Sequence, residues 1–373
     1  MKTHLTVVNN NIFGLNLLRF AAVVLVVMSH FYLFSSSSPA IVAQMASVFG
    51  FLGIEILLVL SGYLLGMNML NRLVGTTERK GTIVLSYLKS RTWRVLPLYY
   101  LFLTIVFVVA LCVGFPVTDS WKYWLFLQNF STPIPSFFPE SWPITVGFFA
   151  SIALILSLAI MVAIFSPKRH SMLFLMITIF FMLLSFCLRI RFYTLSPNTT
   201  LQTWDQQLKS VVIYRLDSFF IGVLFSWICF HRNLWWGRIK YWFAGYALML
   251  FFFLFVGVGY FGWHIEAQTF FWDVLYLPLT SLASALLLPL FSQLHATGFV
   301  ALFASVGRRI SYSLFLIHYS VLMVIAEHLF NISTLKFSVY FLVSLLYLGV
   351  ACFVSFLFYH FFEKPLIDKG RNF

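Results

Sequence analysis

Two ionisable residues share one stripe of the first apolar segment, LLRFAAVVLVVMSHF. Arg19 and His30 are eleven positions apart. In a helix that separation returns to within about 20° of the same face, with an axial rise of roughly 16 Å. An imidazole is neutral yet basic near neutral pH, so it suits general-base chemistry. The spacing predicts a cation near one end of a helix and a candidate catalytic histidine, His30, well along it.

A carboxylate lies in the next apolar segment, FGFLGIEILLVLSGYLLG. An ionisable residue such as Glu55 is costly within a membrane span and indicates a functional site. A helical hairpin could bring Glu55 beside His30, where it would fix the tautomer and raise the basicity of the ring. We therefore predict His30, Glu55 and Arg19 as catalytic. The alternative is a structural trio, with Arg19 reaching the lipid headgroups.

Two further arginines open the third apolar segment, in YLKSRTWRVLPLYY. Arg91 and Arg94 are three residues apart and share a helix face. With Lys89 they form a cluster able to bind phosphate groups. The alternative is that they only anchor the helix at the cytoplasmic membrane surface.

A third group of charges is predicted at the outer rim. Arg189, Arg191, Arg215 and Asp217 are candidate contacts for an anionic acceptor, although Arg215 and Asp217 are equally expected to pair with charges elsewhere. His318, in SYSLFLIHYSVL, falls within an apolar segment. It is interpreted as a buried histidine that hydrogen-bonds a neighbouring helix.

The composition indicates whether these segments face water or lipid. Of 373 residues, 61% are hydrophobic and 9% are charged, whereas a soluble domain carries roughly 25% charged residues. The surface is therefore expected to face lipid, and the net charge of +13 reflects topology and headgroup contacts rather than nucleic-acid binding. The four cysteines lie singly in apolar runs, which predicts neither disulfides nor a metal site.

The elements that must position these residues are transmembrane helices. A bilayer core needs roughly 20 apolar residues per helix, which predicts an all-α bundle of about ten spans in one membrane-embedded domain, residues 1–373, with no fused soluble domain. Seventeen of the 24 lysines and arginines fall in segments on one side, so both termini are expected in the cytoplasm. The predicted spans are 12–35, 41–67 (or two pieces broken near Gly50 and Gly53), 94–115, 142–165, 171–190, 211–230, 240–262, 272–292, 308–330 and 336–361.

Taken in order, these motifs resemble the acyltransferase-3 family of membrane acyltransferases, which includes surface-polysaccharide O-acetyltransferases. The resemblance covers nearly the whole chain. It rests on LNLLRFAAVVLVVMSHF, FGFLGIEILLVLSGYLL, YLKSRTWRVLPLYY, ISYSLFLIHYSVL and FYHFFEKPLIDKG.

The resemblance implies a cytoplasmic acyl-CoA donor, usually acetyl-CoA, and a hydroxyl of an extracytoplasmic glycan or polysaccharide as acceptor. By position, His30 would be the catalytic histidine with Arg19 as its motif partner, and Arg91 and Arg94 would contact the phosphates of CoA. Glu55 takes the place of the family's acidic residue. A bacterial inner membrane, contact with lipid and possible homo-oligomers are further expectations.

One stretch departs from the family. Members commonly open a middle helix with Trp-Ser-Leu-Ser-Val-Glu-Glu, whereas residues 142–148 read WPITVGF, and Glu140 precedes this stretch. The missing carboxylates bear on acceptor choice or on activity itself. An inactive assembly subunit is therefore kept as an alternative. A flippase or transporter of glycans or anions, which also needs charged residues inside a bundle, and a glycan polymerase or ligase are further alternatives.

Overall fold

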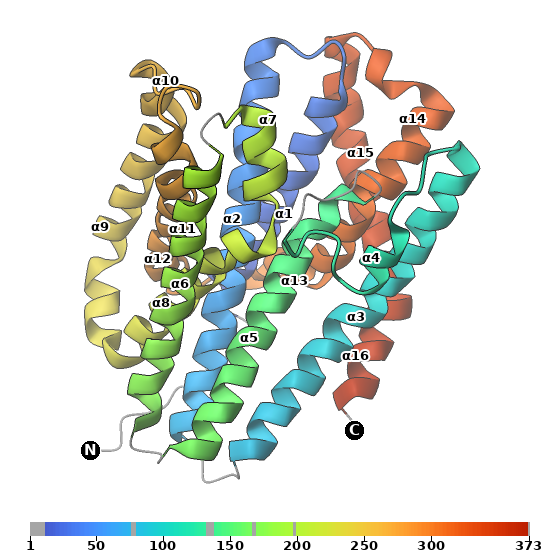
Figure 1. Cartoon of the computed structure of the whole chain (residues 1–373). Helices are drawn as coiled ribbons and strands as arrows, with labels where there is room; N and C mark the ends of the chain where they lie inside the picture. Colours follow the sequence, from blue (N-terminus) through green and yellow to red (C-terminus); the bar gives the residue numbers. More distant parts are fainter. Residues whose placement is uncertain (1–11, 76–79, 132–137, 166–168, 197–198, 372–373) are drawn as a thin grey trace.

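The computed structural model describes residues 12–75, 80–131, 138–165, 169–196 and 199–371, and within these ranges all regular secondary structure is helical (Figure 1). The α-helices are α1 (Phe13–Phe34), α2 (Ala40–Gly75), α3 (Lys80–Val113), α4 (Ser120–Trp124), α5 (Trp142–Ile164), α6 (His170–Leu195), α7 (Leu201–Thr203), α8 (Leu216–His231), α9 (Asn233–Phe252), α10 (Val258–Tyr260), α11 (Leu277–Leu286), α12 (Leu288–Phe291), α13 (Gly298–Ile317), α14 (Val324–Phe330), α15 (Phe337–Phe358) and α16 (Lys364–Arg371).

Shorter helical turns of other types interrupt or join these helices. The 3₁₀ turns are η1 (Pro139–Ser141), η4 (Val212–Tyr214) and η8 (Ile332–Thr334). The π-helical turns are η3 (Trp204–Lys209), η5 (Phe253–Gly257), η6 (Phe271–Tyr276), η7 (His318–Met323) and η9 (Tyr359–Glu363).

The prediction of an all-α bundle of membrane-spanning helices is confirmed, whereas the cytoplasmic position of both termini stays a prediction. In the described part of the chain, nine continuous helical segments are long and apolar enough to cross a bilayer, and α8 is a shorter apolar helix. The chain is thus an integral, multi-pass membrane protein with an all-α bundle. The predicted span 211–230 is too long, because α8 has 16 residues and extends only about 24 Å. The alternative of a broken second span is wrong, since α2 is one helix of 36 residues.

Glycines let the first helices approach closely. A Cβ at Gly53 of α2 would lie 2.5 Å from the carbonyl oxygen of Ala22 in α1, and one at Gly50 would collide with Ser29. Gly62 of α2 likewise meets the carbonyl oxygen of Phe219 in α8. Backbones in contact through small residues pack well in lipid, where no hydrophobic effect drives helices together. The helices α1, α2, α8 and α13 therefore form a tightly packed centre.

Gly222 of α8 tests this packing. A Cβ there would collide with the carbonyl oxygen of Val59 in α2. We expect Gly222→Ala to destabilise the protein by about 1–3 kcal/mol, because the backbones must separate, and thermal unfolding in detergent measures the loss. The matched control is Gly245→Ala in α9, where nothing lies within 4 Å of the new Cβ. Equal unfolding temperatures in the two variants would contradict close packing of α2 on α8.

Candidate functional site

Glu55 does not lie beside His30. The glycine contacts set the register of the antiparallel helices α1 and α2, with Gly50 opposite Ser29 and Gly53 opposite Ala22. This register places Glu55 about seven residues, or roughly 10 Å along the axis, from the level of His30. The predicted pairing of the two residues is therefore wrong.

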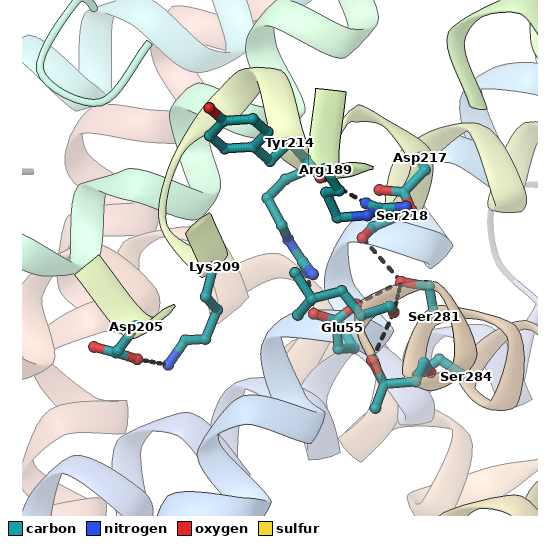
Figure 2. Close-up of polar contacts among 12 residues, drawn as sticks. Glu55, Arg189, Asp205, Lys209, Tyr214, Asp217, Ser218, Ser281 and Ser284 are labelled. Carbon is teal, nitrogen blue, oxygen red and sulfur yellow. Dashed lines mark hydrogen bonds and ion pairs between the residues drawn. The ribbon is translucent and has the colours of Figure 1, made fainter. Parts of the chain in front are cut away.

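Glu55 instead forms a buried ion pair. Its Oε1 accepts a hydrogen bond from Nη2 of Arg215, and its Oε2 accepts one from the hydroxyl of Ser281 at 2.7 Å (Figure 2). Both ionic side chains are 0% exposed. Because a lone charge inside a membrane protein is costly, each partner stabilises the other's burial.

A second ion pair lies next to the first one in the bundle (Figure 2). Nη2 of Arg189 lies 2.8 Å from Oδ2 of Asp217. The Nη1 of Arg189 donates to the carbonyl oxygen of Tyr214 at 2.7 Å, and both members of the pair are almost fully buried. The prediction that Arg215 and Asp217 pair with charges elsewhere is confirmed.

The side chains of Arg189, Arg215 and Asp217, predicted to be ligand contacts at the outer rim, are buried in the bundle. The reason is that the segment before α8 folds inward. Trp204 and Leu208 of η3 are buried, and Nζ of Lys209 lies 5.7 Å from the ring centroid of Phe51 in α2.

The role of these four residues in acceptor binding stays a prediction. Arg191 lies near the end of α6 and is exposed, so its side chain is accessible to a ligand. Arg189 and Asp217 pair with each other and Arg215 pairs with Glu55, so these three side chains are not exposed to a ligand.

His30 has another partner. Its Nδ1 lies 2.8 Å from Nε2 of His318, which is the first residue of η7. The two ring centroids are 5.0 Å apart and the ring planes differ by 4°, so the two nitrogens meet in the ring planes. The prediction that His318 hydrogen-bonds a neighbouring helix is confirmed. No spacing rule identified that partner, because 288 positions separate the two histidines.

The hydrogen bonds determine the tautomers of the two neutral rings. Nδ1 of His318 lies 2.9 Å from the carbonyl oxygen of Phe315, which can only accept, so this nitrogen carries the proton. Nε2 of His318 is then an acceptor, and Nδ1 of His30 must donate to it. The remaining nitrogen of His30, Nε2, therefore carries a lone pair. It makes no hydrogen bond with the residues that the structure describes. This arrangement makes Nε2 of His30 a candidate general base.

An arginine cluster lies at a second level of the bundle. Arg19 interacts electrostatically with Arg94, Arg308 and Arg91. Nη2 of Arg91 makes a weak hydrogen bond of 3.5 Å to the carbonyl oxygen of Gly147. The structure thus brings together three predicted cations from two motifs. It adds Arg308 of α13, which is not among the predicted site residues.

One carboxylate accompanies these cations. Glu363 interacts electrostatically with Arg94 and accepts a hydrogen bond of 2.8 Å from the hydroxyl of Ser313. This contact joins the two C-terminal motifs, SYSLFLIH and FEKP. The cluster keeps an excess of positive charge, which is suited to a ligand with several phosphate groups.

The fold and site define a polytopic membrane protein with an interior histidine pair and a separate arginine cluster. The chain belongs to the acyltransferase-3 family, whose acyltransferase domain matches residues 12–360. It matches no curated protein and no solved structure. Membership implies that the chain carries out acyl transfer at a membrane, and the family resemblance of its motifs is confirmed.

The buried pair of Glu55 and Arg215 gives a stability prediction. We expect Glu55→Ala to cost about 3–5 kcal/mol, because it leaves the Arg215 guanidinium buried without its counter-charge. The double variant Glu55→Leu/Arg215→Leu should recover much of the loss, since it removes both charges. Unfolding in detergent, followed by fluorescence, measures all three proteins. A Glu55→Ala protein that is fully stable but inactive would contradict this structural role and indicate that Glu55 takes part in the reaction.

Proposed function

We propose that this protein transfers an acyl group, most simply acetyl, from cytoplasmic acetyl-CoA to a hydroxyl of an extracytoplasmic glycan. The proposal rests on the observation that helix α1 contributes one residue to each of two sites. Arg19 belongs to the arginine cluster and His30 to the histidine pair. The two residues lie on one stripe of an unbroken helix, roughly 16 Å apart along its axis.

This separation matches the shape of the donor. The pantetheine arm of CoA is about as long as five extended residues, roughly 16–18 Å. With its phosphates held by Arg91, Arg94 and Arg308, the nucleotide stays at the cytoplasmic side while the thioester reaches His30. The acceptor then approaches from the opposite side, so neither substrate has to cross the membrane.

The histidine pair supplies the base in this proposal. Nε2 of His30 removes the proton of the acceptor hydroxyl, and the oxygen attacks the thioester carbonyl. The carbon–sulfur bond breaks, the CoA thiolate leaves, and the imidazolium returns its proton to the thiolate. His318 accepts the hydrogen bond from Nδ1 of His30 throughout. The alternative is a transient acyl group on His30 before transfer to the glycan.

His30→Ala tests the base. We expect loss of acyl transfer by about 10²–10⁴-fold, the usual contribution of a positioned base. Labelled acetyl-CoA and mass spectrometry of the surface glycan of expressing cells measure the product. The matched control is His328→Ala in α14, which changes an exposed histidine. Unchanged acylation in the folded His30 variant would remove His30 from the mechanism. Absence of transfer by the unaltered protein would favour the transporter or assembly-subunit alternative.

Replacement of both Arg91 and Arg94 by Gln tests donor binding. A charged hydrogen bond contributes about 1.5–3 kcal/mol, so we expect the KM for acetyl-CoA to rise at least about tenfold with a smaller change in kcat. Assays of acetyl-CoA consumption by purified protein in detergent measure both constants. Lys122→Gln, which removes a cation paired with Asp119 outside the cluster, is the control. An unchanged KM would indicate that the two arginines only anchor the helix at the membrane surface.

A further inference from the structure

The helix that carries His318 changes its winding at that residue. α13 ends at Ile317, and the π-helical turn η7 begins at His318. A π turn inserts an extra residue into a helix, interrupts the regular hydrogen-bond ladder and occurs frequently at functional sites. Backbone groups of η7 can therefore take partners from other helices.

Glu140 supplies one such partner. One of its carboxylate oxygens accepts a hydrogen bond of 2.8 Å from the backbone N–H of Ser320, and the other accepts one of 2.6 Å from the hydroxyl of the same residue. Glu140 lies in η1, directly before α5, and is only 3% exposed. A single carboxylate thus fastens the second residue after His318.

Tyr347 fastens the same turn from another side. Its hydroxyl, on α15, donates a hydrogen bond to the backbone carbonyl of His318 itself. The two contacts hold backbone groups of His318 and Ser320, and neither partner belongs to α13 or α14. Two other elements of the bundle, η1 and α15, therefore hold the backbone of η7, in addition to the contact of the His318 ring with Phe315 of α13.

We propose that Glu140 is a positioning residue, whose carboxylate holds η7 so that His318 stays in contact with Nδ1 of His30. The catalytic consequence rests on the function proposed above, whereas the geometric consequence does not. When the turn is released, the His318 ring moves away from its 2.8 Å contact, and His30 loses the acceptor that keeps its proton on Nδ1. The carboxylate acts by accepting two hydrogen bonds and takes no part in proton transfer.

The variants Glu140→Ala and Glu140→Gln separate positioning from chemistry. In Glu140→Ala we expect kcat for acetyl transfer to fall about 10- to 100-fold, with an unchanged KM for acetyl-CoA, because the arginine cluster is untouched. Glu140→Gln should keep most of kcat, since the amide oxygen accepts from the Ser320 N–H and the amide nitrogen donates to the Ser320 hydroxyl. Loss of activity in Glu140→Gln equal to that in Glu140→Ala would overturn the proposal, because it would show that the charge itself is used.

The chain offers a matched control of the same kind. Glu327 of α14 accepts hydrogen bonds from the N–H of Ser333 at 2.9 Å and from its hydroxyl at 2.5 Å, and neither residue contacts the histidine pair. Glu327→Ala removes an equivalent double contact, so we expect kcat to stay unchanged. An equal loss of kcat in Glu327→Ala and Glu140→Ala would overturn a specific role of Glu140.

A spectroscopic readout is independent of acyl transfer. Nitrogen NMR of protein labelled with ¹⁵N-histidine, in lipid and at a pH where His30 is neutral, distinguishes protonated from unprotonated ring nitrogens. The signals of His30 are identified by their absence in His30→Gln. We expect one tautomer in the unaltered protein, with the proton on Nδ1, and a mixture in Glu140→Ala. Unchanged His30 signals in Glu140→Ala would overturn the proposal.

A second variant covers the case in which Glu140→Ala does not fold. Tyr347→Phe removes only the hydroxyl that bonds the His318 carbonyl, and we expect the same tautomer mixture and a lower kcat. Mixed tautomers in a protein that transfers no acetyl group would retain the positioning role and reject the proposed function. A single tautomer in both variants of a protein that does transfer acetyl groups would reject the positioning role and retain the proposed function.

Discussion

The structure depends on the neutralisation of charge inside a membrane-embedded bundle. Glu55 with Arg215 and Arg189 with Asp217 form two ion pairs in which every side chain is nearly inaccessible. Each isolated charge would be costly in lipid, so the helices that carry them are constrained to meet. α2, α6 and α8 are thereby fixed at one level, with Ser281 of α11 hydrogen-bonded to the same carboxylate. The inward fold of η3 and η4 follows from this requirement, because it delivers Arg215 to Glu55.

Among the residues that the structure describes, neither histidine of the pair forms a salt bridge, and the charge that acts on His30 is that of Lys209. A carboxylate beside His30 would fix its tautomer by charge, whereas here a neutral chain of hydrogen bonds fixes it, from His30 to His318 to the carbonyl of Phe315. The chain ends on a backbone group that cannot donate, so its direction is unambiguous. A neutral chain is also less costly to bury than an ionised one. Glu55 of α2, whose charge stabilises the fold, is thus separated from His30 of α1, which is suited to catalysis.

The sequence predicted the parts of this arrangement that depend on local periodicity. The spacing of Arg19 and His30 placed them on one face, and the apolar run 12–35 closely matches α1, Phe13–Phe34. Long-range partners were not predictable, because register depends on steric contacts. Gly50 and Gly53 set the offset of α1 and α2 and thereby separate Glu55 from His30. The partner of His30 comes from 288 positions away, beyond any rule of helical spacing.

The departure at residues 142–148 also acquires a physical interpretation. Gly147 stands where the motif of related proteins has its first glutamate. A Cβ at Gly147 would lie 3.9 Å from Nη2 of Arg91, so a glutamate side chain there would lie beside Arg91 and lower the positive charge of the cluster. Nη2 of Arg91 donates to the Gly147 carbonyl oxygen at 3.5 Å, and its buried Nε has no hydrogen-bond partner among the described residues. The missing carboxylate therefore leaves more positive charge for an anionic ligand. The departure bears on the arginine cluster rather than on the histidine pair, whose contacts involve neither Gly147 nor Arg91.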